Sequence, residues 1–127
     1  MEKIIAVAVG GALGALLRYG IAVVANASWQ TAVGRFPIGT FIANVLGGFL
    51  IGLLFQLFRQ ISVPAYVEVL LLTGFMGALT TFSTFGLEII QLYQDGFEQT
   101  AIGYLLLTNI AVILAVVLGM NLTRQFA

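Results

Sequence analysis

The 127-residue chain contains no cysteine and no histidine. The lack of cysteine excludes disulfide bonds and thiol chemistry, and the lack of histidine removes the most common proton shuttle and metal ligand. Charge is scarce as well: five basic and five acidic residues make up 8% of the chain, against about 25% in ordinary soluble domains. With 61% hydrophobic residues and a mean hydropathy of +1.10, the chain is predicted to be an integral membrane protein.

Long apolar segments are abundant, and four of them reach the ~20 residues that a helix needs to cross the hydrocarbon core. Pro37 and Pro64 stand directly before the second and third segments. The links are short, so we expect an all-α membrane protein whose sequential helices are antiparallel, in one domain over residues 1–127. A cleaved signal peptide is disfavoured, because Arg18 interrupts the first apolar run and further apolar segments follow. The expected spans are residues 4–25, 38–58, 65–93 and 101–122.

The distribution of basic residues gives a weak signal for orientation. Lys3, Arg59 and Arg124 fall on one side of the membrane and Arg35 on the other, while Arg18 lies within span one. Lysine and arginine are enriched on the cytoplasmic side. A bias of three against one either places both termini in the cytoplasm or lets copies insert in both orientations, and the sequence leaves both interpretations open.

Small residues form seams along the first two spans. Gly10 and Gly14 share a face of span one, and most of the 15 glycines are interpreted as helix-packing positions. Asn44 in span two differs, because a mid-membrane amide needs partners for two hydrogens and an oxygen. Thr40 lies one turn earlier on the same face. Asn44 therefore either bonds neighbouring helices together or lines a wet path.

The centre of span three reads GFMGALTTFSTFGLE over residues 74–88. Hydroxyl side chains compete for backbone hydrogen bonds and glycine weakens a helix, so we expect this helix to break here. Broken backbone at membrane depth is tolerated only inside protein or along a water-filled cavity, and its free carbonyls form a ready cation site. Phe82 and Phe85 either pack against neighbours or present their positive ring edges to an anion.

Polar residues in the other parts of the spans extend this pattern. Arg18 and Glu88 each cost roughly 2.5–3.5 kcal/mol near a bilayer centre, and less toward an interface. Span four adds Tyr104, Thr108 and Asn109. Tyr104 and Thr108 are four residues apart and share a face, so they form either a polar track or an interfacial tyrosine with a packing threonine.

Three motifs carry a resemblance to a known family: GGALGALLRY in span one, GTFIANVLGGFLIG in span two and GFMGALTTFSTF in span three. In this order and at this chain length, the sequence resembles the Fluc fluoride channels, also called the CrcB family. The resemblance implies a homodimer in the inner (plasma) membrane whose subunits insert in opposite orientations. It also implies two fluoride pathways, a central structural sodium ion, no enzymatic activity and no nucleic-acid partner.

By motif position, the resemblance assigns the sodium ligands to the backbone carbonyls of Gly77 and Thr80 and the vestibule arginine to Arg18. Thr40, Glu88 and Asn109 are further candidates. Val112 occupies a position where the family often has a hydroxyl. The expected fluoride pore consists of Asn44, Phe82, Phe85, Ser83, Thr84, Tyr104 and Thr108.

Three other classes of function have requirements that can be compared with this sequence. A small proton-coupled multidrug exchanger needs a titratable carboxylate in the membrane, typically in span one, and span one offers none. A non-transporting assembly subunit would use its polar stripes only for adhesion. An intramembrane enzyme is not expected, because the acidic residues are scattered and no base accompanies a serine or threonine nucleophile.

Overall fold

The computed structural model describes residues 1–33 and 35–126, with side chains for 1–28 and 35–126. All of its regular structure is helical. Within the described residues, the elements in chain order are α1 (Glu2–Val33), α2 (Ile38–Phe58), α3 (Ala65–Glu68), the π-helix η1 (Val69–Met76), α4 (Gly77–Leu79), α5 (Phe82–Gln94) and α6 (Glu98–Gln125).

Four helical stretches are long and apolar enough to cross a membrane: Glu2–Ser28, Ile38–Phe58, Ala65–Gln94 and Glu98–Gln125. This finding confirms the prediction of an all-helical protein with four helices of spanning length. The first helix continues past Ala25, where the apolar run was expected to end, to Val33.

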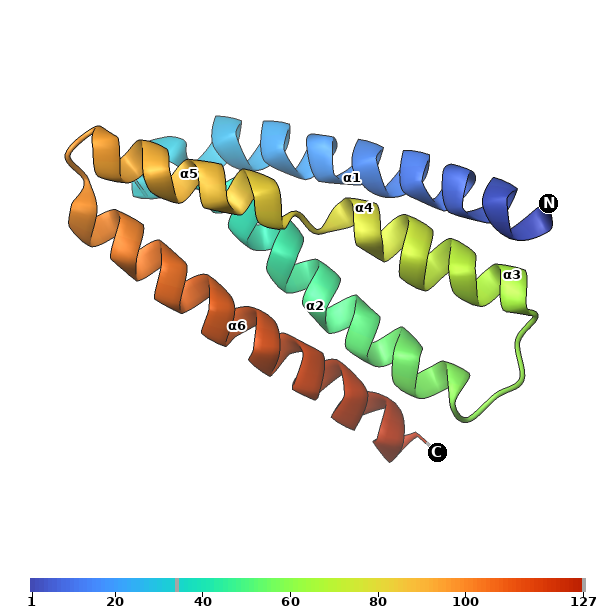
Figure 1. Cartoon of the computed structure of the whole chain (residues 1–127). Helices are drawn as coiled ribbons and strands as arrows, with labels where there is room; N and C mark the ends of the chain where they lie inside the picture. Colours follow the sequence, from blue (N-terminus) through green and yellow to red (C-terminus); the bar gives the residue numbers. More distant parts are fainter. Residues whose placement is uncertain (34, 127) are drawn as a thin grey trace.

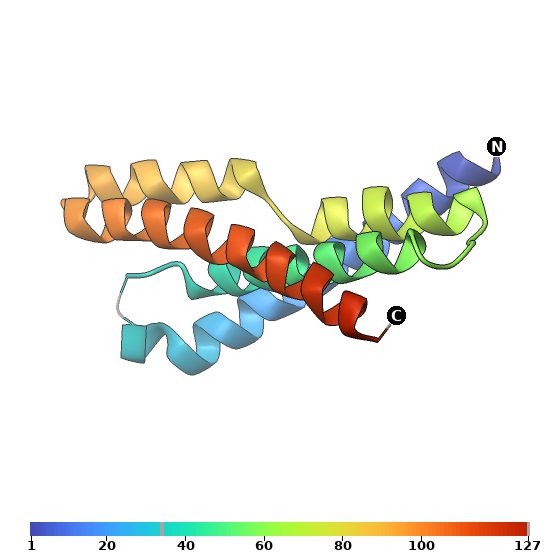
Figure 2. The same cartoon turned by 90° about the horizontal axis from the view of Figure 1, so that it is seen from below.

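The third span changes its packing partner along its length. Its first half, η1 and α4, packs against α1, whereas α5 packs against α6. Helix α2 contacts both α1 and α6. Figure 1 shows α3 and α4 beside α1, α2 and α6 crossing beneath them, and both termini at the same end. Figure 2 shows that α5 lies along α6 and away from α1. The junction of α4 and α5 is therefore where the span passes from one neighbour to the other.

Glycines permit the closest helix contacts. A Cβ added to Gly14 of α1 would collide with the carbonyl oxygen of Phe75 in η1. Between α2 and α6, a Cβ on Gly52 would likewise collide with the carbonyl oxygen of Val116. Backbone-to-backbone approach of this kind is how small residues hold membrane helices together.

The backbone between α4 and α5 is extended. Thr80 has φ −86° and ψ 154°, and Thr81 has φ −149° and ψ 121°. Figure 2 shows this stretch as an extended, non-helical segment between two helices. At this position the chain makes no helical turn, so its hydrogen-bonding groups need other partners.

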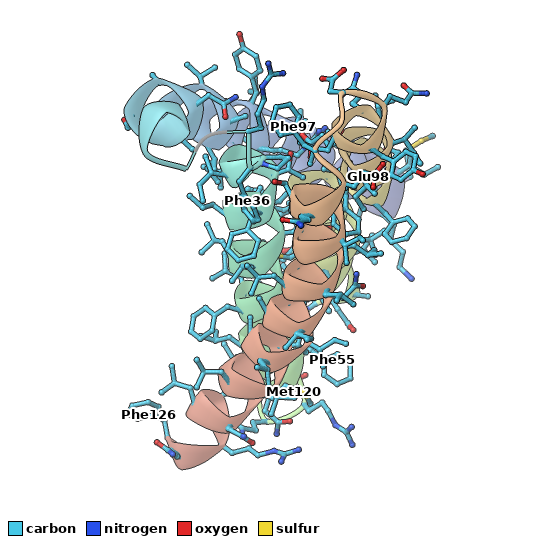
Figure 3. All side chains as sticks on the ribbon, turned by 90° about the vertical axis from the view of Figure 1, so that its left-hand side faces the viewer. Phe36, Phe55, Phe97, Glu98, Met120 and Phe126 are labelled. Atoms are coloured by element: carbon cyan, nitrogen blue, oxygen red, sulfur yellow. The ribbon has the colours of Figure 1, made fainter. Side chains whose placement is uncertain are left out.

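At one end of the molecule, the segment before α2 contacts the link between α5 and α6. Arg35 forms an exposed ion pair with Asp95, at 3.5 Å between Nη1 and Oδ2, and its guanidinium carbon lies 4.9 Å from the ring centre of Phe97. Figure 3 shows Phe36 and Phe97 at this end, and Phe55 and Phe126 toward the other.

Candidate functional site

Asn44 of α2 holds the extended backbone through two hydrogen bonds to Thr81. Its Oδ1 accepts from the Thr81 N–H at 2.8 Å, and its Nδ2 donates to the Thr81 carbonyl oxygen at 3.2 Å. The side-chain amide thus pairs with the backbone in the manner of a neighbouring strand. One hydrogen of Nδ2 remains for another acceptor. These two hydrogen bonds of the Asn44 side chain therefore stabilise the extended backbone at Thr81.

Thr81 is also the N-cap of α5. Its Oγ1 accepts from the Thr84 N–H at 3.2 Å. In a continuous helix, the N–H groups of Thr81 and Thr84 would be donated to the carbonyl oxygens of Gly77 and Thr80. These two N–H groups instead donate to the side-chain oxygens of Asn44 and Thr81, so both carbonyls lose their usual helical partner.

Arg18 of α1 binds the end of α4. Its Nε donates to the carbonyl oxygen of Ala78 at 3.0 Å. The C-terminal end of a helix carries a partial negative charge, which favours a cation there. This bond uses one of the N–H donors of the guanidinium group and leaves the others for further acceptors.

Glu88 joins α5 to two other spans. Its Oε1 accepts from the Thr40 hydroxyl at 2.7 Å, and its Oε2 accepts from the Tyr104 hydroxyl at 2.8 Å. Tyr104 is completely buried, and its ring lies edge-on between Phe36 and Phe85, with centroid distances of 5.1 and 5.0 Å. The aromatic packing fixes the tyrosine so that its hydroxyl reaches the carboxylate.

A cavity of about 310 Å³, which we call the Thr108 cavity, lies beside the extended backbone. The buried Oγ1 of Thr108 has no hydrogen-bond partner among the described residues. The rings of Phe82 and Phe85 have centroids 5.9 Å apart, and Phe82 is 81% exposed. The cavity is lined by Asn44, Gly48, Ile51, Thr80, Thr81, Phe82, Phe85, Thr108, Asn109, Val112, Ile113 and Val116.

A second cavity of about 250 Å³, which we call the Glu88 cavity, lies among α1, α2 and α5. Thr81 lines both cavities, so the extended backbone separates them. The polar side chains of the Glu88 cavity are Arg18, Tyr19, Asn26, Thr40, Thr81, Thr84 and Glu88.

Comparison with known proteins decides the family. Residues 5–120 match the family model described as CrcB-like protein, Camphor Resistance (CrcB). The chain belongs to the CrcB family. This assignment confirms the resemblance found in the sequence motifs.

Curated relatives of this CrcB chain carry one shared name, fluoride-specific ion channel FluC. The protein of Saccharophagus degradans is 41% identical over 95% of this chain and 89% of its own length. That of Chloroflexus aurantiacus is 42% identical over 99% and 98%, and that of Magnetococcus marinus 44% identical over 93% and 94%. These names describe channels, in agreement with the expectation that the chain is not an enzyme.

Membership of the CrcB family and the four spanning helices together make the chain a multi-pass membrane protein. In a bacterium, its place is the plasma membrane.

The predicted site residues of this CrcB chain divide between the two cavities. The Thr108 cavity gathers Asn44, Thr80, Phe82, Phe85, Thr108 and Asn109. The Glu88 cavity gathers Arg18, Thr40, Thr84 and Glu88. Three predicted residues line neither cavity: Tyr104, which binds Glu88; Ser83, whose Oγ lies 3.4 Å from Thr81 Oγ1; and Gly77, which is exposed.

Sequence reasoning missed the roles of Thr81, Asn26 and Phe36. Threonine is a favoured N-cap residue, so Thr81 at the start of a new helix carried a usable signal. Asn26 gave a weaker signal, because it is only a polar residue near the end of the first apolar run; in the structure it lines the Glu88 cavity. Nothing in the local sequence marked Phe36, whose contact with Tyr104 joins positions far apart in the chain.

Proposed function

We propose that this chain is a passive, electrogenic, fluoride-selective anion channel that lowers the fluoride concentration of the cytoplasm. Membership of the CrcB family supports the proposal, as do relatives at 41%, 42% and 44% identity that are named fluoride-specific ion channels. A cytoplasm-negative potential favours anion exit by ~2.3 kcal/mol per 100 mV, so no pump is needed.

The observation that carries the proposal is the hydroxyl of Thr108. Its Oγ1 is buried without a partner among the described residues, and the side chain is 3% exposed. Leaving a buried polar group unsatisfied costs about 1–3 kcal/mol. Thr108 lines the Thr108 cavity, but its Oγ1 is closed off from it, so a χ1 rotation that turns the hydroxyl toward the cavity lets a small anion such as fluoride accept its hydrogen bond and removes this cost.

The pathway we propose runs from the Glu88 cavity past Thr81 into the Thr108 cavity. Arg18 concentrates anions at its entrance, since the guanidinium keeps donors beyond the one that binds Ala78. Glu88 opposes anion entry least when its charge is held by two hydroxyl donors, as it is here. The donors that remain for fluoride are the hydroxyls of Ser83, Thr84 and Thr108 and the free amide hydrogen of Asn44, because Thr40 and Tyr104 each donate their single hydroxyl hydrogen to Glu88.

Phe82 and Phe85 line the pathway with ring edges, which carry partial positive charge. Edges hold an anion weakly, and conduction needs several weak sites with no deep trap among them. An 81% exposed phenylalanine beside a cavity with both polar and apolar lining also fits the surface of a homodimer. In this proposal, two subunits of opposite orientation enclose two pores.

The carbonyl oxygens of Gly77 and Thr80 fit a structural sodium ion at the dimer centre. Their helical N–H partners are bonded to Asn44 and Thr81 instead, and oxygen ligands suit a hard cation. Open space surrounds the position that a Cβ of Gly77 would take, so a second subunit has room to approach. The ion would supply positive charge between the discontinuous helices of the two subunits.

The test is fluoride efflux from liposomes that contain the purified protein, measured with a fluoride electrode and with chloride efflux as the control. We expect rapid fluoride release without chloride release, and strong impairment when both Phe82→Ile and Phe85→Ile are introduced. Fluoride that stays trapped in vesicles carrying the folded protein would overturn the proposal.

A further inference from the structure

The Thr108 cavity changes character along α6. Thr108 and Asn109 line it with polar groups, whereas Val112 and Val116, one and two turns further on, are apolar. We propose that the carboxamide of Asn109 is a fluoride-binding group that serves the part of the pathway next to this apolar lining. The inference rests on the proposed function and adds a fluoride-binding residue to it.

The hydrogen bonding of Asn109 leaves it one donor for a ligand. Its Nδ2 donates to the carbonyl oxygen of Leu105 at 2.7 Å, which uses one of the two amide hydrogens. The bond runs back one turn along α6 and anchors the nitrogen beside the helix. The second hydrogen is free to bind an anion in the cavity that Asn109 lines.

The neighbouring hydroxyl of Thr108 adds a second donor when a χ1 rotation turns it toward the cavity. Thr108 is 3% exposed, lines the same cavity and has no partner for Oγ1 among the described residues. Consecutive helical residues point about 100° apart, so Thr108 and Asn109 approach the cavity from different directions. Asn109 therefore offers a donor in the same cavity as the apolar side chain of Val112.

An ordinary structural role for Asn109 is the alternative. A polar side chain in a membrane helix masks itself by bonding its own backbone, and one such bond is present. Under that role, the residue faces lipid or a partner helix, and replacing it with leucine leaves transport unchanged or improves stability.

The experiment compares Asn109→Leu with Asn121→Leu in the liposome assay. Asn121 is a matched control, because it is an exposed asparagine of the same helix that does not line the cavity. Losing one hydrogen bond to a charged ligand lowers the flux of the Asn109→Leu variant about tenfold at subsaturating fluoride. The half-saturating fluoride concentration rises, and the control variant matches the unmodified protein.

A rescue experiment separates a lost donor from a disturbed structure. Val112 and Thr108 are four residues apart on α6, and both line the cavity. Adding the near-isosteric Val112→Thr to the Asn109→Leu variant supplies a hydroxyl in the same region, so we expect much of the flux to return.

Equal fluoride flux in the Asn109→Leu, Asn121→Leu and unmodified proteins would overturn the inference while leaving the proposed function intact. A loss that Val112→Thr does not restore would also overturn it, because the loss would then reflect structure and not donation to the anion. Absence of fluoride flux from the unmodified protein would overturn the proposed function and this inference with it.

Discussion

At the residue scale, the side chain of Asn44 forms hydrogen bonds with backbone groups that would otherwise be bonded within a helix. It satisfies both the N–H and the carbonyl oxygen of Thr81, 37 residues away in the chain. The sequence marks Asn44 as unusual because a mid-membrane amide needs partners. It does not reveal that the partner is backbone, since that depends on how α2 crosses the third span.

Replacing Asn44 with leucine should destabilise the fold. The change leaves the Thr81 N–H and carbonyl oxygen without partners, at a cost of about 2–4 kcal/mol for the pair of bonds. Thermal unfolding of the Asn44→Leu variant in detergent measures this loss of stability as a lower unfolding midpoint. The Asn121→Leu protein should unfold near the unmodified midpoint, and equal midpoints for both variants would contradict the role given to Asn44.

Replacing Tyr104 with phenylalanine should keep the packing and remove one bond. The ring still fills its place between Phe36 and Phe85, but Oε2 of Glu88 loses its donor. A hydrogen bond to a charged group contributes about 1.5–3 kcal/mol. We expect lower stability and slower fluoride efflux, and unchanged values of both would argue against a role for this bond.

At the element scale, the third span is organised around its change of partner, from α1 to α6. Glycine and hydroxyl content predict a weak helix here, but not which residues leave the helix. That outcome depends on Asn44 and on the Thr81 cap. Helix α1 illustrates a second limit. Hydropathy places its end near Ala25, yet no proline or glycine occurs between Ala25 and Val33 to stop the helix.

Adding a methyl group at Gly14 tests the contact between α1 and η1. The Cβ of alanine would collide with the Phe75 carbonyl oxygen, so Gly14→Ala should cost about 1–3 kcal/mol. Gly11→Ala is the matched control, because open space surrounds its Cβ position. Unfolding midpoints in detergent compare the two variants, and a Gly14→Ala protein as stable as the control would show that the helices are further apart.

At the scale of the whole molecule, the sequence predicts four membrane helices and the family, because both follow from long apolar runs and local motifs. It does not predict how the polar residues divide between two cavities. Arg18 and Glu88 are 70 residues apart in the chain, yet both line the Glu88 cavity. Such groupings arise from helix crossings that no local pattern encodes.

Glu88→Gln distinguishes a channel from a proton-coupled exchanger. Glutamine keeps the shape and still accepts a hydrogen bond from Thr40 or Tyr104, so fluoride efflux should change only a few-fold, because the loss of about 1 kcal/mol of one hydrogen bond is opposed by the removal of a charge that repels anions. An exchanger that depends on protonation of this carboxylate would lose transport completely. Efflux measured at two external pH values gives the comparison.

The most direct test of the account is a current recording of the purified protein in a planar lipid bilayer with different fluoride concentrations on the two sides. The account predicts a current whose reversal potential follows the fluoride gradient and is zero when fluoride is equal on both sides, even if a chloride gradient is present. A fluoride current that reverses at zero under the fluoride gradient, or an equal response to chloride, would contradict a fluoride-selective channel.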